Sequence, residues 1–334
     1  MSKPEKKWRF ATFATFATFA TFAAALSLFA AGAASAQVSE QDIVLDTPTG
    51  QVAGTLQLPD AMEGAPRVAL IIAGSGPTDR DGNSALVPGR NDSLRMLAVA
   101  LAGEGIASVR YDKRGVGASG PAGPAESALR FDTYVDDAAA WIGKLKDDPR
   151  FGAVAVIGHS EGSLIGMLAA RQAGAAAFVS IAGVADGASA VLRKQLAGKL
   201  SPELEKESER ILAALESGAT AEQVPPALMN LYRPSIQPYM ISWFNHVPSQ
   251  HIAALDMPVL IVHGNTDIQV EVTQAYGLHR ARPDATLAII PGMNHVFKHV
   301  RADPALQAAA YSDPSLPVSP LLVKAVSDFL RKDG

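Results

Sequence analysis

Cysteine is absent from this sequence of 334 residues. Its absence excludes disulfides, a thiolate nucleophile, cysteine-bound metal sites and a lipid-modified N-terminal cysteine. Charged residues are also scarce, at 19% of the chain, and the formal net charge is −4. This charge gives no electrostatic reason to bind nucleic acid. Hydrophobic residues make up 48% of the chain, so we expect a folded protein with a sizeable core.

The N-terminal segment, residues 1–36, has the pattern of a secretory signal peptide. Four basic residues precede a long uncharged stretch with four tandem Ala-Thr-Phe copies, and the small residues Ala34–Ala36 follow. This pattern predicts cleavage after Ala36, before Gln37, and a periplasmic or secreted domain of residues 37–334 without stable membrane insertion. An uncleaved membrane anchor is the alternative, because the apolar stretch exceeds the usual signal core.

Short apolar runs alternate with amphipathic patterns along the rest of the chain. We expect strands at 68–73, 106–111, 154–157, 177–181, 258–262 and 285–290, and helices at 93–101, 134–146, 163–172, 272–281 and 321–330. Such alternation predicts parallel β-α-β units in an open sheet with helices on both faces. Residues 42–47 and 51–58 flank Pro48-Thr49-Gly50 and predict an antiparallel hairpin at the sheet edge.

One interval of about seventy residues interrupts this alternation between the strands expected at 177–181 and 258–262. Helical patterns occupy it at 190–199, 202–215 and 226–231, and Pro234, Pro238 and Pro248 punctuate its end. A segment this long inside a compact domain needs its own structure. We therefore predict a helical cap, about residues 186–255, inserted after the sixth strand of the sheet domain.

The apolar run at 154–157 leads directly into Gly158-His159-Ser160-Glu161-Gly162 and then a helical pattern. A G-x-S-x-G motif on a strand–turn–helix is typical of a nucleophile elbow, in which a sharp turn exposes the serine hydroxyl. Close packing at such a turn leaves room only for glycine at the two flanking positions. Ser160 is therefore the predicted nucleophile, and His159 is expected to orient the turn.

A serine nucleophile needs a base, and the base needs an acid that holds its tautomer. His295 follows the last strand, at the edge where open α/β sheets place their sites, and His299 is the alternative base. Asp267 follows the strand at 258–262, whereas Asp256 precedes that strand and would lie at the opposite edge. The chain order serine, aspartate, histidine is the one expected in α/β-hydrolases.

Acyl transfer also requires N–H donors for the developing oxyanion. A glycine-rich loop, residues 73–77, ends the third strand, so we predict the main-chain N–H groups of Ser75 and Glu161 as the donors. A phosphate loop is the alternative, but no Gly-Lys-Ser/Thr follows it. Arg80 or Arg114 could pair with the Glu161 carboxylate, but exposed loop charges are the commoner explanation for such residues.

The end of the cap, residues 238–244, concentrates aromatic and flexible apolar side chains. Trp243 and Phe244 are adjacent, so they cannot both point the same way on a helix or a strand. One of them could line a substrate pocket while the other anchors the cap, or both could belong to the cap core. A bulky pocket wall would favour short acyl chains.

Together, AGSGPTDRDGN, RYDKRGVGASG, GHSEGSLIG, HGNTDIQV and GMNHVFK closely resemble the motifs of the EstD-like bacterial carboxylesterases, α/β-hydrolases related to serine aminopeptidases. The resemblance covers most of residues 41–331. It implies an α/β-hydrolase fold, the triad Ser160, Asp267 and His295, an oxyanion loop at 74–76, and cleavage of small carboxylic esters with short acyl chains. This mechanism requires no cofactor and no metal, and its only implied partner is the small-molecule ester.

Two alternatives remain open. A peptidase of the aminopeptidase-like branch would need a cap carboxylate to bind a substrate amine, and Glu203, Glu205, Glu207, Glu209 and Glu216 are all available. A non-catalytic binding protein on a hydrolase scaffold is the second alternative, although a complete triad and oxyanion loop argue against it.

Overall fold

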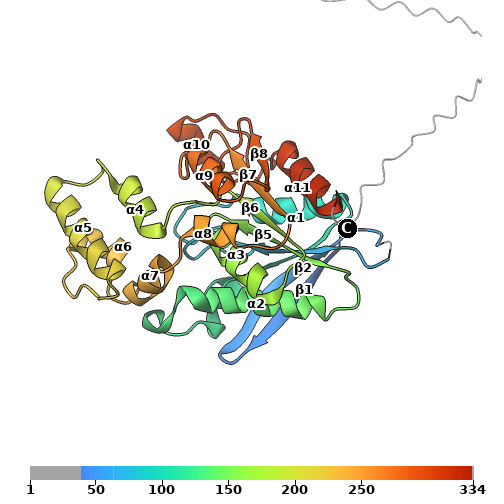
Figure 1. Cartoon of the computed structure of the whole chain (residues 1–334), viewed down its shortest axis with the longest axis horizontal. Coiled ribbons are helices and arrows are strands. Elements are labelled where there is room, and N and C mark those ends of the chain that lie inside the picture. The colour runs from blue at the N-terminus through green and yellow to red at the C-terminus, as the bar shows by residue number, and fades with distance from the viewer. Residues whose placement is uncertain (1–38, 63, 333–334) are drawn as a thin grey trace, which may run out of the picture. The chain divides into compact units, whose positions relative to one another are not determined.

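The computed structural model describes residues 39–62 and 64–332, and the predicted signal segment at 1–36 lies outside this range. An eight-stranded sheet of order β1-β2-β4-β3-β5-β6-β7-β8 forms its centre (Figure 1). The strands are β1 Ser39–Thr47, β2 Gly50–Leu58, β3 Val68–Ile72, β4 Ala107–Tyr111, β5 Val154–His159, β6 Ala177–Ile181, β7 Val259–Gly264 and β8 Thr286–Ile290. β2 pairs antiparallel with β1 and with β4, and every other pair is parallel. The predicted α/β sheet with an edge hairpin is confirmed.

Helices cover both faces of the sheet. One face packs against α1 (Ser93–Gly103) and α11 (Pro320–Lys332). The other packs against α2 (Phe131–Lys146), α3 (Glu161–Ala173), α8 (Pro248–Ala253) and α9 (Thr273–Ala281). Strand β3 shows why both faces need cover, because its side chains alternate between the two cores and all are buried. A strand apolar on both sides is the pattern of a central parallel strand.

Between β6 and β7 the chain forms helices only, as the sequence predicts. They are α4 (Ala188–Leu196), α5 (Pro202–Glu216), α6 (Met229–Tyr232), α7 (Gln237–Phe244) and α8. Figure 1 shows α4, α5 and α6 to one side of the sheet, with α7 and α8 leading back to it. The cap has a small core of its own, in which Ile211, Leu215 and Tyr232 are fully buried.

The end of the cap differs from expectation. Pro238 and Pro248 each lie in the first turn of a helix, α7 and α8, instead of separating helices. The first turn tolerates proline because its N–H groups have no partner within the helix. Two short helices therefore form where the prolines in the sequence suggest breaks in helical structure.

Candidate active site

Ser160 occupies a sharp turn between β5 and α3. Its φ is 55° and its ψ −121°, a conformation that residues with side chains rarely adopt. A Cβ on Gly158 would lie 2.3 Å from the Gly162 carbonyl oxygen, and one on Gly162 would lie 2.4 Å from the Ile72 carbonyl oxygen. Hydrogen alone fits at both positions, which is the geometry of a nucleophile elbow.

Asp267, after β7, and His295, after β8, meet at the carboxyl ends of the strands. Nδ1 of His295 lies 2.7 Å from Oδ2 of Asp267, and both side chains are buried. Oδ1 of Asp267 accepts N–H bonds from Gln269 at 2.8 Å and Val270 at 2.9 Å. Burial alone would raise the pKa of Asp267, but His295, the Val270 N–H and the nearby His263 together lower it. The aspartate is therefore held as an anion against the imidazole.

The structure joins His295, and not His299, to the aspartate. His299 is exposed and its ring packs over the position of Gly292. In the described part of the chain the Ser160 hydroxyl makes no hydrogen bond, to His295 or to any other group. Catalytic hydrogen bonds of this kind are often long without substrate and tighten on binding.

His159, next to Ser160 in the elbow, bonds to the loop after β8 that carries His295. Its Nε2–H donates to the His295 carbonyl oxygen over 3.0 Å, and the two rings lie 4.7 Å apart between centroids. Burial, and next the neighbouring His295, lower the pKa of His159 to about 3. His159 is therefore a neutral donor that holds the backbone of His295 beside Ser160.

The loop after β3 lies against the nucleophile. A Cβ on Gly74 would lie 3.2 Å from Cβ of Ser160, so this loop and the elbow are in direct contact. Among the described residues, no acceptor takes the main-chain N–H of Ser75 or that of Glu161. Both predicted oxyanion donors are thus available to a ligand next to Ser160.

Neither arginine considered as a partner of Glu161 pairs with it. Arg80 pairs with Asp112, and Arg114 pairs with Asp137, so neither arginine reaches Glu161. Lys113, which stands between Asp112 and Arg114 in the sequence, pairs with Glu161 instead, with Nζ 3.2 Å from Oε2. Neighbouring basic residues in one loop thus point in different directions, which no sequence pattern specifies.

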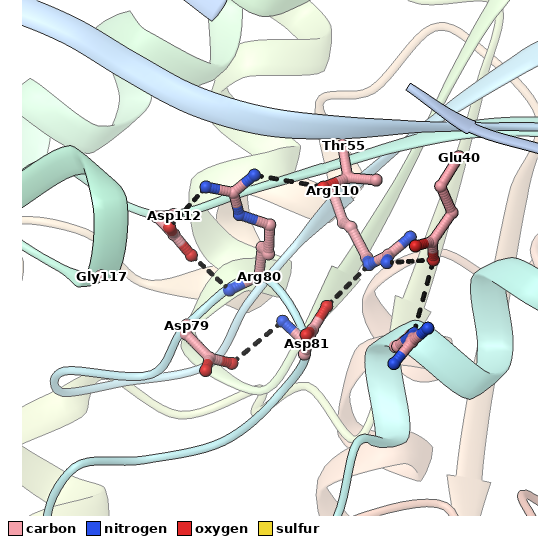
Figure 2. A pocket seen from close by; sticks show the side chains of 9 residues that line it. Glu40, Thr55, Asp79, Arg80, Asp81, Arg110, Asp112 and Gly117 are labelled. Atoms are coloured by element: carbon pink, nitrogen blue, oxygen red, sulfur yellow. Dashed lines mark hydrogen bonds and ion pairs between the residues drawn. The ribbon is translucent and has the colours of Figure 1, made fainter. Parts of the chain in front are cut away.

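A charged pocket of about 340 Å³ lies beside the loop after β3. Figure 2 shows its ion pairs: Arg80 of the loop binds Asp112 beyond β4, and Arg110 of β4 binds Asp81 of the loop and Glu40 of β1. The Arg80 main-chain N–H also donates to Asp112. These bonds tie the loop that carries Ser75 to the sheet.

The cap reaches the site through α7. Trp243 stacks on Phe131 of α2 with 6.1 Å between centroids and 6° between planes, whereas Phe244 packs against the cap core. Tyr239 is buried, and its hydroxyl donates to Oε1 of Glu161 over 2.7 Å. Neither Tyr239 nor Lys113 is singled out as a site residue by the sequence, because their shared partner is distant along the chain.

In ranges 39–62 and 64–332, no three histidine, aspartate or glutamate side chains are grouped so that they could hold a metal ion. None of the helices in these ranges is long and apolar enough to cross a membrane.

The fold and this arrangement define an α/β-hydrolase of the serine hydrolase type. The chain belongs to the serine aminopeptidase family S33, whose sequence profile matches residues 81–299. No curated protein matches the chain closely enough in sequence to count as a relative.

Several solved structures share the fold. Est1E from Butyrivibrio proteoclasticus with bound ferulic acid is 20% identical over 87% of this chain and 98% of its own, with a TM-score of 0.60. An esterase from Pyrococcus furiosus is 15% identical over 89% and 91%, with a TM-score of 0.55. A thermophilic esterase from Thermogutta terrifontis is 14% identical over 88% and 99%, with a TM-score of 0.52. At such low identities these similarities establish the fold alone.

Proposed function

We propose that this protein is a carboxylesterase of the EstD-like kind, which cleaves small esters with short acyl chains through an acyl-enzyme on Ser160. One observation carries the proposal: His295 and Asp267 are joined at 2.7 Å on the sheet edge where Ser160 stands on its strained turn. A buried acid that fixes the tautomer of a histidine beside such a serine is the arrangement that activates a hydroxyl for acyl transfer.

The proposed reaction has two halves. Oγ of Ser160 bonds to the ester carbonyl carbon while Nε2 of His295 accepts the hydroxyl proton, and the carbonyl oxygen becomes an oxyanion. The N–H groups of Ser75 and Glu161 donate to that oxyanion. Collapse breaks the bond to the alcohol, which leaves with the proton from His295. Water then attacks the acyl-enzyme by the same steps and releases the acid and free Ser160.

Substrate size is proposed to follow from the aromatic end of the cap. Trp243 lies between the sheet domain and the cap, where a ring that borders the acyl pocket would stop long chains. Each methylene that fits should contribute up to about 0.8 kcal/mol until the pocket ends. We expect best activity on acetyl to butyryl esters, little beyond about eight carbons, and a shift to longer chains in Trp243→Ala or Phe244→Ala. Loss of thermal stability without a shift in either variant would assign both rings to the core.

An aminopeptidase is the second candidate, since the family carries that description. It requires a free carboxylate for the substrate amine, and three of the five cap glutamates are already paired with arginines. The exposed Glu209 and Glu216 share Arg193, and the half-buried Glu207 pairs with Arg210. Glu161, next to the nucleophile, is occupied by Lys113. These contacts favour the esterase.

Kinetics of Ser160→Ala test the proposal, with Ser163→Ala as matched control. Ser163 is a buried serine three residues along, bonded to Ser180 at 2.7 Å. We expect kcat for p-nitrophenyl butyrate to fall at least about 10⁴-fold in Ser160→Ala and little in the control. A fluorophosphonate should label Ser160 in the wild type, and absence of labelling would favour the binding-protein alternative. A higher kcat/KM on aminoacyl p-nitroanilides than on any ester would assign the peptidase activity instead.

A further inference from the structure

Lys113 is a buried lysine beside the nucleophile elbow, and it touches both parts of the predicted oxyanion hole. Its Nζ donates to the Gly74 carbonyl oxygen over 2.6 Å and to Oε2 of Glu161 over 3.2 Å. The side chains of Lys113 and Glu161 are only 1% and 3% exposed. We propose that Lys113 is a positioning residue, which fixes both oxyanion donors with one ammonium group. This inference rests on the proposed esterase function.

The first donor is fixed through a single peptide unit. The carbonyl of Gly74 and the N–H of Ser75 belong to the same planar peptide group, and no peptide bond in the described residues is cis. In a trans peptide the C=O and N–H point in opposite directions. Because Lys113 holds the Gly74 oxygen on one side, the Ser75 N–H is directed to the other. A cation on the carbonyl oxygen also polarises the peptide and strengthens its N–H as a donor.

The second donor is fixed through the side chain of its own residue. Glu161 begins α3, and its carboxylate is held at Oε2 by Lys113 and at Oε1 by the Tyr239 hydroxyl at 2.7 Å. These two bonds restrain the residue whose N–H faces the oxyanion. The ammonium also neutralises a carboxylate that would otherwise oppose negative charge forming one residue from Ser160.

Tyr239 extends this network into the cap. It lies on α7, whereas Lys113 follows β4 and Glu161 begins α3, so three separate elements meet in one buried cluster. Phe131 and Tyr134 surround the Tyr239 ring, and the Lys113 ammonium lies 5.0 Å from the centroid of Tyr134. The position of α7 thereby bears directly on the geometry of the oxyanion hole.

The double variant Lys113→Met with Glu161→Gln tests the proposal, because it removes both charges and leaves neither one unpaired in the interior. Removal of one oxyanion donor costs about 10²–10³-fold in kcat. We expect kcat for p-nitrophenyl butyrate to fall about 10²-fold or more with KM within about threefold. Affinity for a trifluoromethyl ketone, which forms a tetrahedral adduct, should fall in proportion. A double variant with kcat within threefold of the wild type would overturn the proposal.

Arg114→Met is the matched control. Arg114 is the next residue, is comparably buried and has its own ion pair with Asp137, but it touches neither oxyanion donor. We expect it to lose thermal stability while it keeps kcat and inhibitor affinity. Equal losses of kcat in this control and in the double variant would assign Lys113 a structural role and overturn the proposal.

A third variant decides the question if the double variant does not fold. Tyr239→Phe removes a single hydroxyl from Glu161 and should lower kcat about 3–10-fold at constant KM. An unchanged kcat in this variant would then refute the network. If the wild type itself lacks esterase activity and fluorophosphonate labelling at Ser160, the proposed function has failed, which is a separate outcome from these.

Discussion

Replacement of Asp267 by asparagine probes the assignment of the acid in the triad. Asp267 uses both oxygens: Oδ1 accepts N–H bonds from Gln269 and Val270, and Oδ2 accepts the Nδ1–H of His295. An asparagine has only one oxygen. The two main-chain donors should keep that oxygen at the Oδ1 position, since a reversed amide would set its NH₂ against two N–H groups.

The asparagine NH₂ then faces Nδ1 of His295, which must give up its hydrogen. The imidazole proton moves to Nε2, where the ring can no longer accept the proton of Ser160. An incorrect tautomer of this kind lowers kcat about 10⁴-fold in Ser-His-Asp hydrolases. That factor corresponds to about 5 kcal/mol of transition-state stabilisation. The fold should persist, because Oδ1 keeps its bonds and the side chain keeps its volume.

The assay is hydrolysis of p-nitrophenyl butyrate at saturating substrate, together with circular dichroism and urea denaturation. Asp256→Asn is the control, since Asp256 is an exposed aspartate before the same strand, β7, at its opposite end. We expect the control to keep wild-type kcat. A folded Asp267→Asn variant with kcat within tenfold of the wild type would refute the reasoning, and Asp267 would then only stabilise its loop.

Three further predictions concern the base, the elbow and export. His295→Ala should be nearly inactive on p-nitrophenyl butyrate and His299→Ala nearly unaffected; the reverse result would reassign the base. The pKa of His159 is about 3 in the native state. Between about pH 6.5 and 3, His159 is therefore protonated in the unfolded chain but neutral in the native protein. Native stability should therefore fall as the pH drops through this window, by up to about 1.4 kcal/mol per pH unit, and less steeply in His159→Gln when urea unfolding is measured. We also propose export with signal cleavage, so intact-mass measurement of protein from the cell envelope should give an N-terminus at Gln37, whereas a full-length membrane-bound chain would support the anchor.

The sheet and its catalytic edge could be predicted from sequence because their signals are local. Each strand is a short apolar run, and the elbow is five consecutive residues with two glycines that only hydrogen can satisfy. The placement of Asp267 and His295 together follows from one rule, that parallel strands bring their carboxyl ends to one edge.

The network behind the oxyanion hole could not be predicted in the same way. Asp112, Lys113 and Arg114 are consecutive, but they pair with Arg80, Glu161 and Asp137 respectively. The direction of each side chain at the end of β4 decides its partner. The position of Tyr239 depends on α7, and Pro238 in the first turn of this helix makes the sequence there resemble a break in helical structure. Contacts between residues distant in sequence depend on tertiary packing, and a single chain contains no periodic signal for them.

The separate core of the cap has a consequence for how such enzymes can diversify. Helices α4, α5 and α6 bury side chains against one another and against Met240 and Phe244 of α7, in a core apart from those on the two faces of the sheet. This part can therefore vary in length or sequence without disturbance of the sheet, provided that the same side of α7 stays covered. Helix α7 cannot be exchanged with them, since its Tyr239 is bonded to Glu161 and its Trp243 is stacked on Phe131. A new substrate-binding module would therefore be joined to this scaffold before α7, near Arg233, and it would have to cover Met240 and Phe244 of α7 in place of the present cap core.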